Sequence, residues 1–234
     1  MAITVIIVAA GMGTRMGAKT TKQLIDLGGR PILWHTIKAF EGMVDINEII
    51  LVVKAEERAY IIETMIKPSG FSKVSAVVVG GKERSDSVRN GLAAIRHSDV
   101  IMIHDGARPF VKETSIKDLI NALKDYDAAI LALPVKDTIK RVDHNREVVH
   151  TYNRSELWAV QTPQAFRSEV IKAAFKLELS KDLIIYDDAM LVEAAGCDKI
   201  KIVKGEETNI KITTPFDLII GNTIYNMNRG DTNV

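Results

Sequence analysis

The residues best suited to chemistry lie in a glycine-rich loop near the amino terminus. Gly11, Gly13 and Gly17 carry no side chain, so the backbone can approach a ligand closely and present its N–H groups to an anion. Arg15 and Lys22 add two positive charges to the same loop. This combination favours a site for the phosphates of a nucleotide. A tight strand-to-helix turn with solvated basic residues is the open alternative.

Two common phosphate-binding loops do not fit this stretch. The dinucleotide fingerprint requires glycines at its first, third and sixth positions, but the sixth position here is Met16. The P-loop requires a glycine five residues after its first glycine, and that position is again Met16. The loop therefore belongs to neither type.

Short β-branched runs alternate with longer amphipathic segments, which predicts a doubly wound α/β sheet with helices on both faces. The expected strands cover residues 3–10, 47–53, 74–79, 100–103, 128–133 and 199–203. The expected helices cover residues 31–41, 56–66, 87–95, 115–123, 168–177 and 187–196, with a last helix from Pro215. Ser168 and Thr214 are expected N-caps. Residues 161–164 are expected to form a connection.

Polar and glycine-rich loops follow three of the expected strands. They cover residues 11–22, 80–87 and 104–109, and each contains charged or hydroxyl side chains. In open α/β sheets, ligands bind beyond the carboxyl ends of the strands. The sequence therefore predicts that the three loops meet in one site.

The bulk properties exclude several other classes of protein. The 234 residues carry a formal net charge of +1 without a block of like charge, so neither nucleic acid nor a membrane surface is an expected partner. Cys197 is the only cysteine, which excludes an intrachain disulfide. The histidines lack metal-ligand spacing, and no apolar run approaches the roughly 18 residues of a membrane span. We expect a cytoplasmic protein with one domain over residues 1–228 and a disordered tail over residues 229–234.

A polar segment over residues 134–158 interrupts the α/β pattern. Apolar residues on both sides of an Asp-His-Asn-Arg stretch at 143–146 predict a β-hairpin arm. A two-stranded arm is marginally stable alone in water, so we expect it to pack against a partner subunit. An exposed, solvated loop is the alternative.

Taken in order, the motifs of this chain resemble those of the cytidylyltransferases of isoprenoid biosynthesis. The resemblance covers residues 4–224, nearly the whole chain. It rests on the segments at 9–15, 22–23, 80–88, 104–109, 134–138, 154, 161–164, 187–189 and 209–213.

The resemblance implies a Rossmann-like nucleotidyltransferase fold, a mostly parallel sheet and a homodimer joined by the arm. It also implies CTP as co-substrate, Mg²⁺ as cofactor and 2-C-methyl-D-erythritol 4-phosphate as acceptor in the non-mevalonate pathway. The products would be 4-diphosphocytidyl-2-C-methyl-D-erythritol and pyrophosphate. Three alternatives stay open: D-ribitol 5-phosphate as acceptor, UTP or GTP as donor, and a nucleotide-binding module without catalysis.

The same resemblance implies roles for individual residues. Catalytic cations would be Arg15, Lys22 and Lys211. Nucleotide contacts would come from Ala9, Ala10, Gly11, Gly13, Thr14, Gly80, Gly81, Ser87, Asp105 and Gly106. Asp105 would also hold the metal ion, and the acceptor would meet Asp105, Arg108 and Thr162, with Thr138 and Arg154 reaching the acceptor of the neighbouring subunit. His104 is expected to be structural, and Asp187 and Asp188 to begin a helix.

Overall fold

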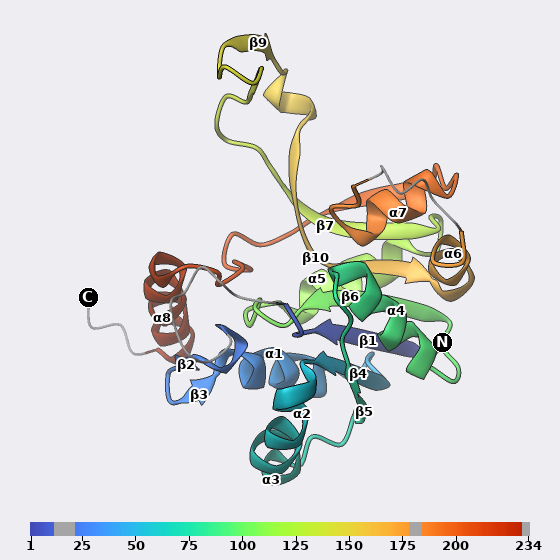
Figure 1. Cartoon of the computed structure of the whole chain (residues 1–234), viewed down its shortest axis with the longest axis vertical. Coiled ribbons are helices and arrows are strands. Elements are labelled where there is room, and N and C mark those ends of the chain that lie inside the picture. Colours follow the sequence, from blue (N-terminus) through green and yellow to red (C-terminus); the bar gives the residue numbers. More distant parts are fainter. Residues whose placement is uncertain (12–21, 178–183, 231–234) are drawn as a thin grey trace.

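A seven-stranded, mostly parallel sheet forms the centre of the molecule (Figure 1). The computed structural model describes residues 1–11, 22–177 and 184–230. In this part of the chain the strand order is β11-β7-β10-β6-β1-β4-β5. The strands are β1 (Ile3–Val8), β4 (Glu48–Val53), β5 (Val74–Val79), β6 (Val100–Asp105), β7 (Ala128–Pro134), β10 (Trp158–Arg167) and β11 (Ile200–Lys204).

Helices cover both faces of this sheet, as expected from the alternating pattern. Val5 and Ile7 of β1 point to one face, where they pack with α1 (Ile32–Glu41) and α5 (Glu113–Ala122). Ile6 points to the other face, where the apolar cluster includes residues of α4 (Arg84–Ala94), α6 (Ser168–Ala174) and α7 (Asp188–Ala194). The β-branched run of β1 is thus explained by burial on both sides, which is usual for a strand inside a parallel sheet.

The helix expected over residues 56–66 is longer and less regular than predicted. It comprises α2 (Ala55–Ile61), a π-helical turn η3 (Ile62–Ile66) and α3 (Lys67–Ser69). Gly70 ends it with a left-handed backbone, at φ 62°. Glycine adopts this conformation at no steric cost, so its position explains where the helix stops.

Two local predictions were wrong. Residues 161–164 do not form a connection but lie inside β10, which runs antiparallel to both β6 and β7. The register of β10 against β7 shifts between Val160 and Gln164, and such an irregularity allows Pro163 inside a strand. Ser168 is not an N-cap: Arg167 occupies that position, and the Ser168 N–H donates to the Asp99 carbonyl.

The segment over residues 134–158 extends away from the sheet (Figure 1). Within it, β8 (Lys140–Val142) pairs antiparallel with β9 (Val148–Thr151), and a 3₁₀ turn, η4 (Arg154–Glu156), follows. Most of its apolar side chains are exposed, with Val148 at 62% and Val149 at 51%. A role of this arm in dimerisation stays a prediction.

The carboxyl-terminal helix α8 (Pro215–Arg229) packs beside the strands β2 (Asp26–Leu27) and β3 (Arg30–Pro31) (Figure 1). Thr214 caps this helix and Pro215 is its first residue, both as predicted. A small apolar cluster joins the regions, with Leu27, Ile32 and Ile212 fully buried. None of the described helices has the length and apolar character needed to cross a membrane.

Candidate active site

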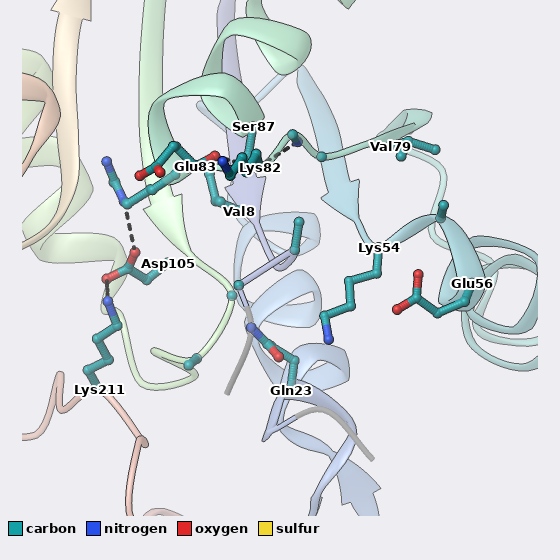
Figure 2. Close-up of a pocket in the computed structure, with 18 residues that line it drawn as sticks. Val8, Gln23, Lys54, Glu56, Val79, Lys82, Glu83, Ser87, Asp105 and Lys211 are labelled. Atoms are coloured by element: carbon teal, nitrogen blue, oxygen red, sulfur yellow. Dashed lines mark hydrogen bonds and ion pairs between the residues drawn. The ribbon is translucent and has the colours of Figure 1, made fainter. Parts of the chain in front are cut away.

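An open pocket of about 470 Å³ lies at the carboxyl ends of β1, β4, β5 and β6 (Figure 2). The meeting of three loops at this edge is confirmed for their described residues. Residues that line the pocket include Ala10, Gly11, Gln23, Lys54, Glu56, Gly80, Gly81, Lys82, Arg84, Ser87, Asp105, Gly106 and Lys211.

Asp105 ends β6 and lies among three cations at one side of the pocket. Its Oδ2 is 2.9 Å from Lys211 Nζ and 3.5 Å from Arg108 Nε, and its Oδ1 is 3.7 Å from Arg84 Nε. Figure 2 shows Lys211 and Asp105 pointing toward each other. Burial alone would raise the pKa of Asp105, but Lys211, Arg84 and Arg108 hold it well below its usual range. The carboxylate is therefore charged at neutral pH.

Arg84 links Asp105 to a second buried carboxylate. Its Nη2 donates to Asp188 Oδ2 at 2.7 Å, and the Asp188 side chain is only 2% exposed. Burial would lower the pKa of Arg84, but Asp188 and Asp105 raise it above its usual range. Burial also raises the pKa of Asp188, because Arg84 offsets only part of the cost of placing a carboxylate there. Arg84 thus joins α4, β6 and α7 through two charged contacts.

Residues that do not line the pocket form a hydrogen-bonded network that holds the backbone of Asp105. The Asp105 N–H donates to Thr162 Oγ1 at 3.0 Å, and Thr162 Oγ1 lies 3.1 Å from His104 Nδ1. His104 Nε2 lies 3.0 Å from the Arg108 carbonyl oxygen. These partners fit a neutral imidazole that donates from Nε2 and accepts at Nδ1. His104 is fully buried, so a structural role fits its position.

Stability should depend on pH through His104. Burial lowers the pKa of His104 from 6.5 to about 4. Between about pH 6.5 and pH 4, the unfolded chain therefore binds a proton at His104 that the folded chain does not bind. The contribution of His104 to the free energy of unfolding is therefore complete above about pH 6.5. It decreases as the pH falls toward 4, by at most about 1.4 kcal/mol per pH unit. Urea unfolding of the ligand-free protein measures this slope.

The matched variants are His104→Gln and His144→Gln, the second in the exposed turn of the arm. We expect the first to flatten the stability profile between pH 4 and 6.5 and the second to keep it. Equal slopes for His104→Gln and the unsubstituted protein would contradict this reading of the histidine.

The glycine pair after β5 allows two elements to approach closely. A Cβ on Gly80 would lie 2.3 Å from Ala10 Cβ and 2.8 Å from Ser87 Oγ, and a Cβ on Gly81 would lie 2.2 Å from Asp86 Cβ. These glycines therefore bring the end of β1 against the start of α4. The pocket wall at this point is bare backbone.

Gly80→Ala is expected to lower the free energy of unfolding by about 2 kcal/mol, because the added methyl group must displace Ala10 and Ser87. Gly42→Ala is the control, since the nearest atom to its added Cβ is 3.6 Å away and Gly42 has a right-handed helical backbone. Denaturant unfolding measures both variants. A loss no greater for Gly80→Ala than for Gly42→Ala would show that the site tolerates a side chain.

The predicted site residues lie in several different parts of the structure. Most of the described nucleotide-site residues and Lys211 line the pocket, while Ala9 is buried beneath it. Arg108 and Thr162 lie behind Asp105. Thr138 and Arg154 lie in the arm, and the Arg154 guanidinium donates to the Lys136 carbonyl oxygen. Gly13, Thr14 and Arg15 lie outside the described residues, as does the side chain of Lys22.

Sequence reasoning assigned no role to several residues of the pocket. Lys54 follows β4, so the rule that ligands bind after strands could have indicated it. Arg84 belongs to a quoted motif, but its pairing with Asp188 has no sequence signal because 104 residues separate them. Among the described residues, no cluster of three or more histidine, cysteine or acidic side chains could hold a metal ion by itself.

A mostly parallel sheet with a glycine-lined, cation-rich pocket at its carboxyl edge is an arrangement in which α/β proteins bind phosphorylated ligands, and the fold is that of nucleotidyltransferases. A model of the 2-C-methyl-D-erythritol 4-phosphate cytidylyltransferase family matches residues 3–227. The chain belongs to this family, whose members are enzymes of the non-mevalonate isoprenoid pathway.

Individual relatives agree with the family match. The chain is 50% identical to the 2-C-methyl-D-erythritol 4-phosphate cytidylyltransferase of Alkaliphilus metalliredigens, over 97% of this chain and 94% of that protein. It is similar to the crystal structure of 4-diphosphocytidyl-2C-methyl-D-erythritol synthase from Anaerococcus prevotii, with a TM-score of 0.83, 36% identity and 96% of each chain covered. The corresponding cytidylyltransferase of Francisella tularensis gives a TM-score of 0.79 at 32% identity, covering 95% of this chain and 99% of that one. The resemblance found in the motifs is thus confirmed.

Proposed function

We propose that this chain transfers the cytidylyl group of CTP to 2-C-methyl-D-erythritol 4-phosphate in the pocket beside Asp105, and releases pyrophosphate. The observation that carries the proposal is the arrangement of Lys211, Arg84 and Arg108 around one buried carboxylate. These groups lie at the sheet edge where α/β proteins bind phosphorylated ligands. The family match over residues 3–227 supports the choice of both substrates.

The reaction places two anions in contact. An oxygen of the acceptor phosphate attacks the α-phosphorus of CTP, the bond from this phosphorus to the bridging oxygen breaks, and pyrophosphate leaves. The nucleophile belongs to the substrate, and a phosphate monoester is already nucleophilic at neutral pH. The protein must therefore position the two phosphates and stabilise charge on the α-phosphate oxygens.

Lys211 is the described cation best placed for this task. Its side chain is 37% exposed and its Nζ faces the pocket, where Asp105 fixes its position at 2.9 Å. Arg84 is 32% exposed and is held by Asp105 and Asp188 on the same side. Arg15 and Lys22 are proposed to add positive charge from the amino-terminal loop. Preorganised charges of this kind need no rearrangement as the reaction proceeds.

A divalent metal fits the donor chemistry at Asp105. Mg²⁺ commonly binds one or two protein carboxylates together with substrate phosphates. Asp105 Oδ1 is 3.7 Å from Arg84 Nε, longer than a hydrogen bond, which leaves this oxygen open to a further ligand. We propose Asp105 as the residue that would hold the ion, which would supply charge neutralisation for the substrate phosphates.

The arm suggests how the acceptor site is completed. Thr138 and Arg154 belong to a segment that extends away from the sheet of its own chain (Figure 1). We propose that they reach the acceptor phosphate in the pocket of a second copy, within a homodimer joined by the arms. The exposed apolar residues of the arm, including Val148 and Val149, support a buried contact there. Location in the cytoplasm and the lack of a nucleic-acid partner stay predictions.

Hybrid dimers test the shared site. Arg154→Ala and Lys211→Ala would each be inactive alone, because each homodimer carries two damaged sites. If residues of both copies form each site, mixing the two variants should restore part of the activity through one intact site per hybrid. Arg141→Ala, another exposed arginine in the arm, is the matched control and should remain active. No recovery after verified subunit exchange would contradict the proposal.

A nucleotide comparison tests the donor. Pyrophosphate release is measured with 2-C-methyl-D-erythritol 4-phosphate and CTP, UTP, GTP or ATP in turn. The proposal expects release with CTP to exceed release with every other nucleotide. Equal or faster release with UTP or GTP would assign the chain a different donor, and CTP binding without release would favour a non-catalytic module.

A further inference from the structure

Lys211 lies in a segment that has no regular secondary structure to fix it. Residues 205–214 form neither helix nor strand. The apolar residues Ile210 and Ile212 suggest a strand in the sequence, but the chain here crosses between β11 and α8 without pairing in the sheet. Besides the direct contact of its Nζ with Asp105, the position of the lysine must therefore depend on contacts made by its neighbours.

One carboxylate of α8 binds the backbone just beyond Lys211. Asp217 Oδ2 accepts hydrogen bonds from Thr213 N, Thr213 Oγ1 and Thr214 N, each at 2.8 Å. In return, the Asp217 N–H donates to Thr214 Oγ1 at 3.2 Å. The two bonds with Thr214 form an ordinary capping box. The two bonds with Thr213 exceed what capping requires.

The same segment is held from its other side by Ile212. This side chain is fully buried with Leu27 and Ile32, and its N–H donates to the carbonyl oxygen of Ala107, a residue of the pocket wall, at 2.9 Å. Helix α8 approaches closely, since a Cβ on Gly221 would lie 2.9 Å from Ile212 Cδ1. Asp217 and Ile212 therefore hold the backbone on the carboxyl side of Lys211 between α8 and the pocket.

We propose that Asp217 is a positioning residue for the reaction, and that its hydrogen bonds with Thr213 hold Lys211 at the phosphates. Asp217 itself does not line the pocket, so it acts through the lysine. The inference rests on the proposed function, because it assigns the lysine to the reacting phosphates. It extends the catalytic machinery from the pocket wall to the first turn of the carboxyl-terminal helix.

A double-mutant cycle with Lys211→Met tests this coupling. Asp217→Ala is expected to lower kcat/KM about tenfold, because misplacing a catalytic group by 1 Å can cost about a hundredfold. In the Lys211→Met background the same substitution should change kcat/KM less than about twofold, since the group it positions is already absent. Equal losses in both backgrounds would overturn the proposal.

Thr214→Ala is the matched control for helix capping. It removes the return bond from Asp217 N but leaves both bonds from Thr213 in place. We expect it to lower Tm as Asp217→Ala does, with less than about a twofold effect on kcat/KM. If Asp217→Ala does not fold, Thr213→Val removes only the hydroxyl bond and should give a smaller loss that is again absent in the Lys211→Met background. If Thr214→Ala lost as much activity as Asp217→Ala, helix capping alone would explain the effect of Asp217.

Amide hydrogen exchange gives a readout that does not depend on activity. The proposal expects faster exchange at residues 210–212, which Asp217 does not touch, in Asp217→Ala but not in Thr214→Ala. Unchanged exchange there would overturn the inference even if no substrate were turned over. Failure of the unsubstituted protein to release pyrophosphate would contradict the proposed function, and the exchange result would still decide whether Asp217 fixes this segment.

Discussion

Lys211→Met is expected to lower kcat/KM for cytidylyl transfer about a hundredfold, the usual cost of removing one preorganised donor from a charged transition state. Methionine keeps the length and apolar stem of the side chain but removes the charge beside Asp105. The fold should survive, because the lysine is 37% exposed and Arg108 and Arg84 remain near the carboxylate. Initial rates of pyrophosphate release measure the effect.

Lys117→Met is the matched control for this loss. Lys117 is an exposed lysine of α5 paired with Glu113 and lies outside the pocket. Its replacement should leave kcat/KM unchanged. A Lys211→Met protein that folds normally and keeps more than about a third of the kcat/KM of the unsubstituted protein would remove Lys211 from the catalytic groups.

Arg84→Met is expected to lower the free energy of unfolding by about 3 kcal/mol, because it leaves Asp188 buried without its cation. It should also lower activity, since Asp105 loses one of the three charges that surround it. The combined loss follows from the position of Arg84 between two carboxylates, of which Asp188 is 2% exposed and Asp105 is 7% exposed. Urea unfolding and pyrophosphate release measure the two effects separately.

A second substitution separates the cost of the buried charge from the loss of packing. The double variant Arg84→Met with Asp188→Leu removes both charges and should recover part of the lost stability but not the lost activity. Arg96→Met, at an exposed position after α4, is the control for removing an arginine. If the double variant were less stable than Arg84→Met, the uncompensated carboxylate would not be the source of the loss.

The sequence predicted the inner parallel strands well because β1, β4 and β6 are buried on both faces. The run over residues 3–10 shows this, since a charge-free β-branched stretch has few alternatives. Strand β10 was missed because Pro163 usually ends a strand, whereas here a register shift of β10 against β7 accommodates it. That shift depends on a partner strand, which local sequence does not reveal.

The sequence predicted the site residues that follow strands, but not the pairs that form between side chains far apart in the chain. Gly80, Gly81 and Asp105 each follow or end a strand, and the rule for open α/β sheets places them at one edge. The Arg84–Asp188 pair joins two helices far apart in the chain, so neither residue type nor spacing indicates it. Lys211 looked like part of a strand, and the long-range contacts of Asn209, Ile212 and Thr213 that hold its segment have no sequence signal.

Pyrophosphate release with CTP and Mg²⁺, compared between 2-C-methyl-D-erythritol 4-phosphate and D-ribitol 5-phosphate as acceptor, tests cytidylyl transfer and the identity of the acceptor together. We expect strong preference for the erythritol phosphate, with release that depends on Lys211. Preference for the ribitol phosphate would keep the fold and the phosphate site but contradict the assignment of the acceptor. Release with neither acceptor would contradict cytidylyl transfer to these polyol phosphates.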